Sequence, residues 1–125
     1  MAKVLVVDDS AMSRRILKDI LASDGHDVIE AQDGLTALEL YFLQKPEIVM
    51  LDLIMKEMYG VEVLKKIREM DRNARVIVAS ADIQTSTQEL AQDAGAVAFI
   101  TKPFVRDRVL AAVRSAMEGA SDGSK

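Results

Sequence analysis

Five short apolar segments alternate along this chain with longer amphipathic segments, and this alternation limits the fold more than any other feature. The apolar segments are residues 3–7, 27–31, 47–51, 75–79 and 97–100. Four of them are almost continuously apolar, which is typical of strands that are buried on both faces of a parallel sheet. Strand and helix signals that alternate five times predict an α/β domain with right-handed crossovers.

The amphipathic segments predict five helices. Ser10 is a suitable N-cap for the first, whose residues Met12, Ile16, Ile20 and Leu21 share a face at helical spacing. The inward residues expected for the second and third helices are Leu35, Leu38 and Phe42, and Val61, Leu64 and Ile67. The bounds expected for the last two helices are residues 84–94 and 105–117.

Length and composition exclude several classes of protein. The chain has 125 residues, which suits one domain, and it has no cysteine for disulfide or thiol chemistry. No apolar run is long enough to span a bilayer, and acidic residues at positions 8 and 9 interrupt any signal peptide. The net charge is −4 and basic residues are scattered, so we expect a cytoplasmic protein without direct nucleic-acid binding. The small, polar residues 119–125 are expected to form a flexible tail after a domain over residues 1–118.

Polar residues follow the apolar segments directly. Asp8 and Asp9 follow the first, Asp52 the third and Ser80 the fourth, while Lys102 lies just beyond the fifth. Ligands of open parallel sheets bind outside the carboxyl ends of the strands, and a 2-1-3-4-5 strand order would bring the three aspartates together. Three carboxylates at one edge repel each other unless a cation joins them, and hard oxygen ligands suit Mg²⁺. With an added ammonium and hydroxyl, the set favours a phosphoryl group as ligand.

Each of these residues also has an ordinary structural explanation when taken alone. An aspartate at a strand end can cap the next helix, and a serine there can belong to a turn. Asp52 is the informative case, because an unpaired charge after the buried run EIVML would be costly. Its occurrence together with the other four residues favours a functional site over separate caps.

Four sequence pieces at successive strand ends carry a resemblance to a known family. They are VLVVDDS, EIVMLDLIM with Gly60 following, VIVASA and FITKPF. Over essentially the whole chain, the sequence resembles the receiver domains of two-component response regulators. This resemblance implies a flavodoxin-like, doubly wound, five-stranded parallel sheet of order 2-1-3-4-5 with five helices.

The resemblance also implies a role for each acidic residue. Asp52 would be the phosphoacceptor, taking a phosphoryl group from a histidine kinase or phosphotransfer protein and becoming an aspartyl phosphate. Asp9 would ligate Mg²⁺ directly and Asp8 mostly through water, with Asp52 and the backbone carbonyl of Ile54 as further ligands. Such a domain is a signalling module rather than an enzyme, since it catalyses only its own phosphoryl transfer and dephosphorylation.

Further residues would respond to phosphorylation in a protein of this family. Lys102 would pair with a phosphoryl oxygen, Ser80 would move toward another, and the switch residue Phe99 would then turn inward. The surface of helix four, strand five and helix five would change, controlling a downstream protein target or forming a phosphorylation-dependent homodimer. The face of helix one that carries Ala11, Arg14 and Lys18 would meet the kinase.

One position departs from the family pattern, and two others are expected to influence the rate of dephosphorylation. Lys56 stands where a proline is usual, which predicts a more mobile acceptor loop. Ile54, two residues after the acceptor, is expected to shield the phosphoryl group from water, whereas Asp82 could either repel or orient a water.

Other functions remain alternatives from the sequence. The chain could be the receiver fragment of a multidomain regulator such as a DNA-binding transcription factor. A phosphatase with a nucleophilic aspartate usually carries a second acid at the position of Ile54, and a nucleotide-binding module would need a glycine-rich loop after strand one. A degenerate receiver is disfavoured by the complete set Asp8, Asp9, Asp52, Ser80 and Lys102.

Overall fold

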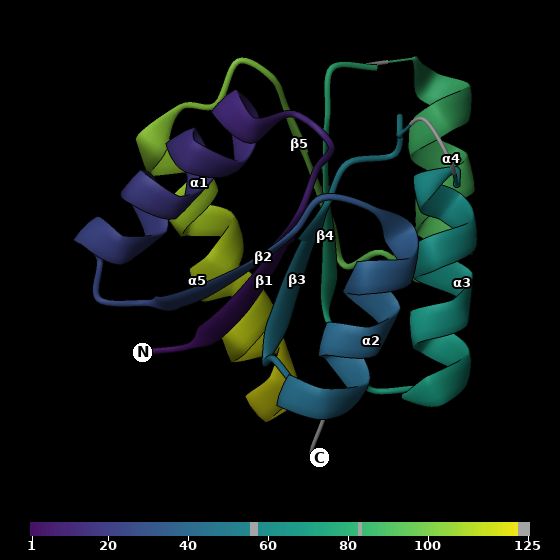
Figure 1. Cartoon of the computed structure of the whole chain (residues 1–125), viewed down its shortest axis with the longest axis horizontal. Helices are drawn as coiled ribbons and strands as arrows, with labels where there is room; N and C mark the ends of the chain where they lie inside the picture. The colour runs from purple at the N-terminus through teal and green to yellow at the C-terminus, as the bar shows by residue number, and fades with distance from the viewer. Residues whose placement is uncertain (56–57, 83, 123–125) are drawn as a thin grey trace.

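Five parallel strands form one sheet of order β2-β1-β3-β4-β5, as expected (Figure 1). The computed structural model describes residues 1–55, 58–82 and 84–122, with side chains described as far as Glu118. The strands are β1 (Lys3–Val7), β2 (Asp27–Ala31), β3 (Ile48–Leu51), β4 (Val76–Ser80) and β5 (Ala98–Thr101). The helices are α1 (Ala11–Ser23), α2 (Gly34–Gln44), α3 (Gly60–Met70), α4 (Thr85–Asp93) and α5 (Arg106–Asp122).

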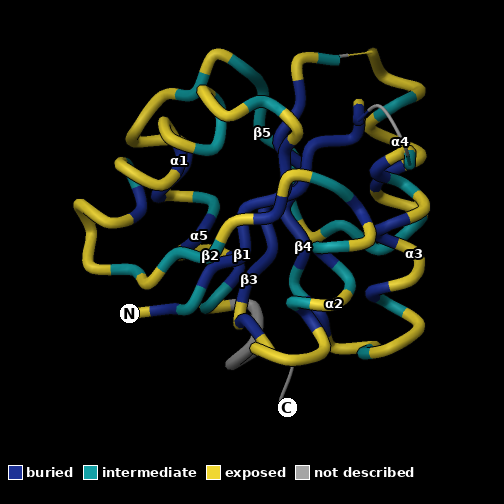
Figure 2. Tube along the Cα trace, in the orientation of Figure 1, coloured by how far each residue is buried: buried dark blue, intermediate teal, exposed yellow. Residues whose placement is uncertain are grey.

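The helices cover both faces of the sheet, so the central strands are buried on both sides (Figure 2). α1 and α5 pack on one face, and α2, α3 and α4 pack on the other (Figure 1). Every residue of β3 and β4 is buried. This double burial explains why these two segments are nearly continuous in apolar residues.

The strand register places the predicted site residues at one level of the sheet. Val7 at the end of β1 pairs with Leu51 at the end of β3, and Ser80 pairs with Thr101 at the end of β5. Asp8 and Asp52 are the next residues along β1 and β3, so they emerge side by side at the carboxyl edge. The topology alone therefore brings the acidic residues together.

The helix boundaries follow the capping chemistry of the sequence. Ser10 caps α1, and its hydroxyl accepts a hydrogen bond from the Ser13 amide at 3.2 Å. Asp33 caps α2 by accepting from the Thr36 amide at 2.7 Å. Gly25, just after α1, has φ of 85°, a conformation that glycine adopts without strain.

The inward faces expected for the first two helices were partly wrong. In α1, Met12 and Ile16 are exposed, and Leu17 lies in the core together with the expected Leu21. In α2, Leu35 and Phe42 are both 69% exposed. Apolar residues occur on most sides of α2, so the helical spacing of apolar residues could not show which side is buried.

Small residues decide which side of α2 is buried. The residues of α2 in the core are Gly34, Ala37 and Tyr41. A Cβ at Gly34 would lie 2.8 Å from Val63 Cγ2, so α2 approaches the side chains of α3 closely at this glycine. The inward stripe of α3 was expected correctly for Leu64 and Ile67, whereas Val61 is only partly buried.

The C-terminal helix is longer than the sequence suggested. α5 continues to Asp122, past the expected end at Met117. The predicted tail over residues 119–125 therefore begins within the helix, and residues 123–125 lie outside the described residues, as does Lys56. Across the part of the chain that the structure describes, no helix is both long and apolar enough to cross a membrane.

Candidate functional site

Three carboxylates meet at the carboxyl ends of β1 and β3. Asp8, Asp9 and Asp52 each offer an oxygen, and these oxygens all lie within 4.8 Å of one another. Asp8 is 1% exposed and Asp52 is 5% exposed, whereas Asp9 is exposed to solvent. The expected cluster therefore forms, with two members inside the protein and one open to the outside.

Asp52 is held in place by the backbone around it. Its amide donates to the Val7 carbonyl at 2.9 Å, which continues the pairing of β3 with β1. Its Oδ1 accepts from the Ile54 amide at 3.1 Å. The amide of Gly60 donates to the Leu53 carbonyl at 2.9 Å, so the start of α3 packs directly on the acceptor segment. The carboxylate is thus fixed at the edge of the sheet rather than carried on a free loop.

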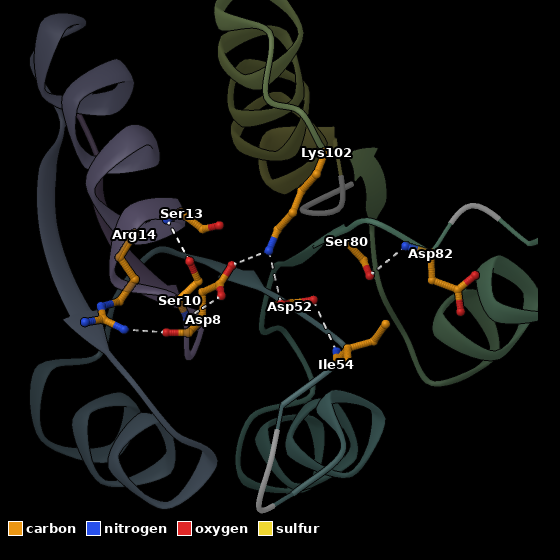
Figure 3. Close-up of polar contacts among 9 residues, drawn as sticks. All are labelled: Asp8, Ser10, Ser13, Arg14, Asp52, Ile54, Ser80, Asp82 and Lys102. Atoms are coloured by element: carbon orange, nitrogen blue, oxygen red, sulfur yellow. Dashed lines mark hydrogen bonds and ion pairs between the residues drawn. The ribbon is translucent and has the colours of Figure 1, made fainter.

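Asp8 is fixed by both its backbone and its side chain. Its amide donates to the Ala31 carbonyl at 3.1 Å, and its Oδ1 accepts from the Ser10 amide at 2.9 Å. Its Oδ2 lies 2.9 Å from Nζ of Lys102. The side chain of Asp8 is therefore aimed at the space it shares with Asp52 (Figure 3).

Lys102 reaches from the end of β5 into the acidic cluster (Figure 3). Its Nζ lies 3.3 Å from Asp52 Oδ2 as well as 2.9 Å from Asp8 Oδ2. The Phe104 ring centroid lies 5.9 Å from the same ammonium. Phe104 stands in the FITKPF piece, but its contact with Lys102 was not expected from the sequence. The peptide bond between Lys102 and Pro103 is cis.

The pKa values of both Asp52 and Lys102 are raised above their ordinary values. Burial, followed by the charge of Asp8, raises the pKa of Asp52 above its ordinary value, against the opposing effects of the Ile54 amide and Lys102. Burial alone would lower the pKa of Lys102, but its contacts with Asp8 and Asp52 raise it overall. Asp52 therefore has an environment that disfavours its charge, and Lys102 stays protonated beside it.

The donor set fits a hard divalent cation. Asp8 Oδ2 is buried and has no hydrogen-bond donor among the described residues besides its ion pair with Lys102. Among the described residues, Lys102 is the one cation paired with Asp8 and Asp52, so the charge of the three carboxylates is only partly compensated. Asp9 gives the cluster an open side through which an ion can enter. Carboxylate oxygens with open positions are the surroundings that Mg²⁺ prefers.

Ser80 lies beside the cluster but is bonded elsewhere. It is fully buried, and its Oγ accepts from the Asp82 amide at 3.2 Å. Asp82 in turn accepts from the Gln84 amide at 3.0 Å and from Thr87 Oγ1 at 2.7 Å. Its carboxylate therefore points toward α4 and away from Asp52 (Figure 3). Ile54 and Asp82 were both expected to influence the access of water to the phosphoryl group. Of these two residues, Ile54 is the one next to Asp52.

Phe99 occupies the middle of the surface formed by α4, β5 and α5. It is half-buried and packs against the core on the side of α4. Its side chain lines two shallow hollows of about 220 Å³ and 260 Å³, one toward Ala91 and one toward Val109. Phe99 therefore borders open surface space toward both α4 and α5.

Replacing Lys102 by methionine is expected to destabilise the fold at neutral pH. The two buried carboxylates would lose their cation, which costs roughly 1–3 kcal/mol. The loss should shrink as the pH falls and the carboxylates become protonated, since their penalty exists only when they are charged. Urea unfolding at several pH values measures this, with Lys65→Met as the control because Lys65 is an exposed lysine of α3. Equal effects of the two substitutions would contradict the expectation.

Comparisons with known proteins agree with this geometry. A family model described as the response regulator receiver domain matches residues 4–114. The chemotaxis protein CheY of Bacillus subtilis (strain 168) is 43% identical over 116 residues, which cover 92% of this chain and 97% of that protein.

Solved structures show the same fold. A CheY-like response regulator receiver domain protein from Methanospirillum hungatei superposes with a TM-score of 0.92 over 98% of both chains, at 21% identity. A chain in the CheX-CheY-BeF3-Mg+2 complex from Borrelia burgdorferi is 38% identical, with a TM-score of 0.88 over 92% of this chain and 88% of that chain.

Proposed function

This chain belongs to the response regulator receiver family, and from that premise we propose that it is an Mg²⁺-dependent switch in which Asp52 accepts a phosphoryl group. Receiver domains are signalling domains of two-component systems rather than enzymes in the usual sense. The observation that carries the proposal is the joint position of Asp8, Asp9, Asp52 and Lys102 at one edge of the sheet. The switch would occupy residues 1–118 and act in the cytoplasm.

The proposed reaction is a phosphoryl transfer to a carboxylate. An oxygen of Asp52 attacks the phosphorus of a phosphohistidine on a histidine kinase or phosphotransfer protein. The new O–P bond forms as the N–P bond breaks, and the imidazole leaves with the electron pair and takes up a proton. Asp52 suits this role because the Ile54 amide fixes its orientation and the buried surroundings leave it poorly solvated.

Charge neutralisation is the second requirement of the transfer. Asp8, Asp9 and Asp52, with the carbonyl of Ile54, would hold Mg²⁺, which would shield the negative charge of the phosphoryl group. The solved CheY relative at 38% identity is described as a complex with Mg and BeF3, which supports this assignment. Lys102 already lies 3.3 Å from Asp52 Oδ2 and would pair with a phosphoryl oxygen.

The response to phosphorylation would begin at Ser80. Its hydroxyl now accepts from the Asp82 amide, and it would turn to donate to a phosphoryl oxygen instead. Phe99 would then turn inward, away from the surface hollows that it now lines. The surface of α4, β5 and α5 would change shape and control a downstream protein target or a homodimer contact. The CheX complex of the CheY relative supports a protein target.

Incubation with acetyl phosphate tests the proposal without knowledge of the kinase. We expect the intact mass to increase by one phosphoryl group when Mg²⁺ is present and to stay unchanged when EDTA removes it. A sample that gains no phosphoryl group under either condition, or gains it equally in EDTA, would contradict the proposed function.

Ile54→Asn is expected to speed the loss of the phosphoryl group. Ile54 is apolar, is 57% exposed and follows Asp52 by two residues, so it can limit the access of water to the phosphoryl group. An amide at this position could hydrogen-bond an attacking water, so we expect decay to accelerate several-fold, which is less than the roughly 100-fold that the placement of a reactant can contribute. The measurement is the decay of isolated phosphorylated protein, with Ile54→Val as the control. Slower decay in Ile54→Asn would contradict the shielding role.

A further inference from the structure

Arg14 makes a contact with the acidic site that its place on α1 did not suggest. Its guanidinium Nη1 donates to the backbone carbonyl of Asp8 at 2.7 Å (Figure 3). Only 15% of the Arg14 side chain is exposed, so this residue lies against the protein rather than extending into solvent. Arg14 was expected on a kinase-binding face, but its guanidinium is already engaged within the protein.

A second element of the fold holds the guanidinium in position. Glu30 on β2 accepts from Arg14 Nε at 3.2 Å, and Lys18 Nζ lies 3.7 Å from the other oxygen of Glu30. β2 pairs along its whole length with β1, and Glu30 lies opposite Val6. The guanidinium is therefore fixed between a sheet strand and the loop that follows β1, using the planar fork that distinguishes arginine from lysine.

The carbonyl that Arg14 binds belongs to the peptide group between Asp8 and Asp9. The amide of Asp8 is held by the Ala31 carbonyl, so with Arg14 both backbone groups of Asp8 have a partner. Asp9 has no hydrogen bond or ion pair to its carboxylate among the described side chains. Its direction is therefore set by the backbone, and the plane of the Asp8–Asp9 peptide is what Arg14 restrains.

We infer that Arg14 is a positioning residue that sets the Mg²⁺ affinity of the acidic cluster by holding the Asp8–Asp9 peptide in its metal-binding orientation. The inference rests on the proposed function, because it assumes that this cluster is a magnesium site. Groups that orient metal ligands from outside the coordination sphere typically contribute 10-fold to 100-fold to metal affinity. Arg14 acts here through a backbone carbonyl, so we expect an effect of roughly tenfold, the lower end of that range.

Whether the loss of Arg14 weakens or tightens Mg²⁺ binding distinguishes a positioning role from a purely electrostatic one. A positive charge close to the cluster opposes the binding of a cation, so removing it should tighten Mg²⁺ binding if charge is all that matters. Removing a positioning residue should weaken binding instead. Arg14→Met is thus expected to weaken Mg²⁺ binding although it removes a positive charge.

Calorimetric titration of the metal-free protein with MgCl2 tests the inference. We expect the dissociation constant to rise roughly tenfold in Arg14→Met. Arg14→Lys should also bind more weakly than the wild type, because one ammonium cannot hold both Glu30 and the Asp8 carbonyl as the guanidinium does. Arg15→Met is the matched control, since Arg15 is the next residue of α1 and is exposed, and its dissociation constant should stay the same or fall slightly.

The amide NMR spectrum recorded without metal provides an independent measurement. Arg14→Met should shift the Asp9 and Ser10 amides before any Mg²⁺ is added, and Arg15→Met should leave them in place. Binding by Arg14→Met that is as tight as binding by Arg15→Met would overturn the inference and leave the proposed function intact. A wild-type protein that binds no Mg²⁺ would overturn the proposed function itself, so the two failures are distinguishable.

Discussion

Asp52→Asn is expected to carry no phosphoryl group after incubation with acetyl phosphate and Mg²⁺. The amide nitrogen and the neutral carbonyl of asparagine lack the charge that makes the carboxylate a nucleophile. The neighbouring Asp8 and Asp9 are proposed to hold Mg²⁺ and not to accept the phosphoryl group, so we expect neither to replace Asp52 as the acceptor. The intact mass of the treated variant measures the outcome.

The matched control for this experiment is Asp27→Asn. Asp27 is exposed and begins β2, at the edge of the sheet opposite the acidic cluster. This variant should be phosphorylated like the wild type. Full labelling of Asp52→Asn would show that another residue is the acceptor.

Asp52→Asn is also expected to raise the free energy of unfolding at neutral pH. The environment of Asp52 raises its pKa, which means that the folded state disfavours the charged carboxylate relative to the unfolded state. The resulting loss of stability is fully present above the raised pKa. It disappears as the pH falls through that value toward the ordinary value of 3.8.

Removing the charge at Asp52 should therefore stabilise the protein most near neutral pH, with an advantage that shrinks in acid. Denaturant unfolding of both proteins between neutral and acidic pH, without Mg²⁺, measures the difference. Asp52 would then be a residue that is kept for function at a cost in stability. A variant that is less stable than the wild type at neutral pH would contradict this interpretation.

Gly60→Ala is expected to destabilise the fold strongly and to slow phosphorylation. A Cβ at Gly60 would lie 2.5 Å from Leu53 Cα and closer still to the carbonyl oxygen of Asp52. Both neighbours are backbone atoms of the acceptor segment, so neither can move without displacing the Asp52 carboxylate. Forcing extra volume into a packed site typically costs 1–3 kcal/mol, and we expect roughly the upper end of that range here because the backbone must shift.

Gly34→Ala is the control for Gly60→Ala. It separates a general loss of stability from a slower phosphorylation of Asp52. Gly34 also opens a helix, but its added Cβ would meet the side chains of Val63 and Met58. These side chains can rearrange, so we expect a smaller loss of stability and a phosphorylation rate close to that of the wild type. Unfolding in urea and labelling with acetyl phosphate measure both quantities. A Gly34→Ala protein that is slower to phosphorylate than Gly60→Ala would contradict the account.

The sequence predicted the site better than it predicted the packing of the helices. The strands could be located because burial on both faces leaves runs such as IVML without polar residues. The site followed from the rule that polar residues directly after parallel strands share one edge, which brought Asp8, Asp52 and Lys102 together. The strand order itself came from the resemblance to the family.

Side-chain directions were beyond what the pattern could show. α2 carries apolar residues on most of its surface, so its expected inward residues Leu35 and Phe42 are exposed. The orientation of Asp82 depends on hydrogen bonds from the Gln84 amide and Thr87, and that of Arg14 depends on Glu30, which is distant in sequence. Such contacts between separate elements leave no period or spacing in the sequence.

The most direct test of the central claim is to locate the phosphoryl group in the labelled wild-type protein. Borohydride reduces an aspartyl phosphate to homoserine, and peptide mass spectrometry then identifies the converted residue. The account predicts homoserine at position 52 when labelling is carried out with Mg²⁺, and unmodified aspartate at that position when EDTA is present. Conversion at Asp8 or Asp9 instead, or a stable phosphate on Ser80, would contradict it.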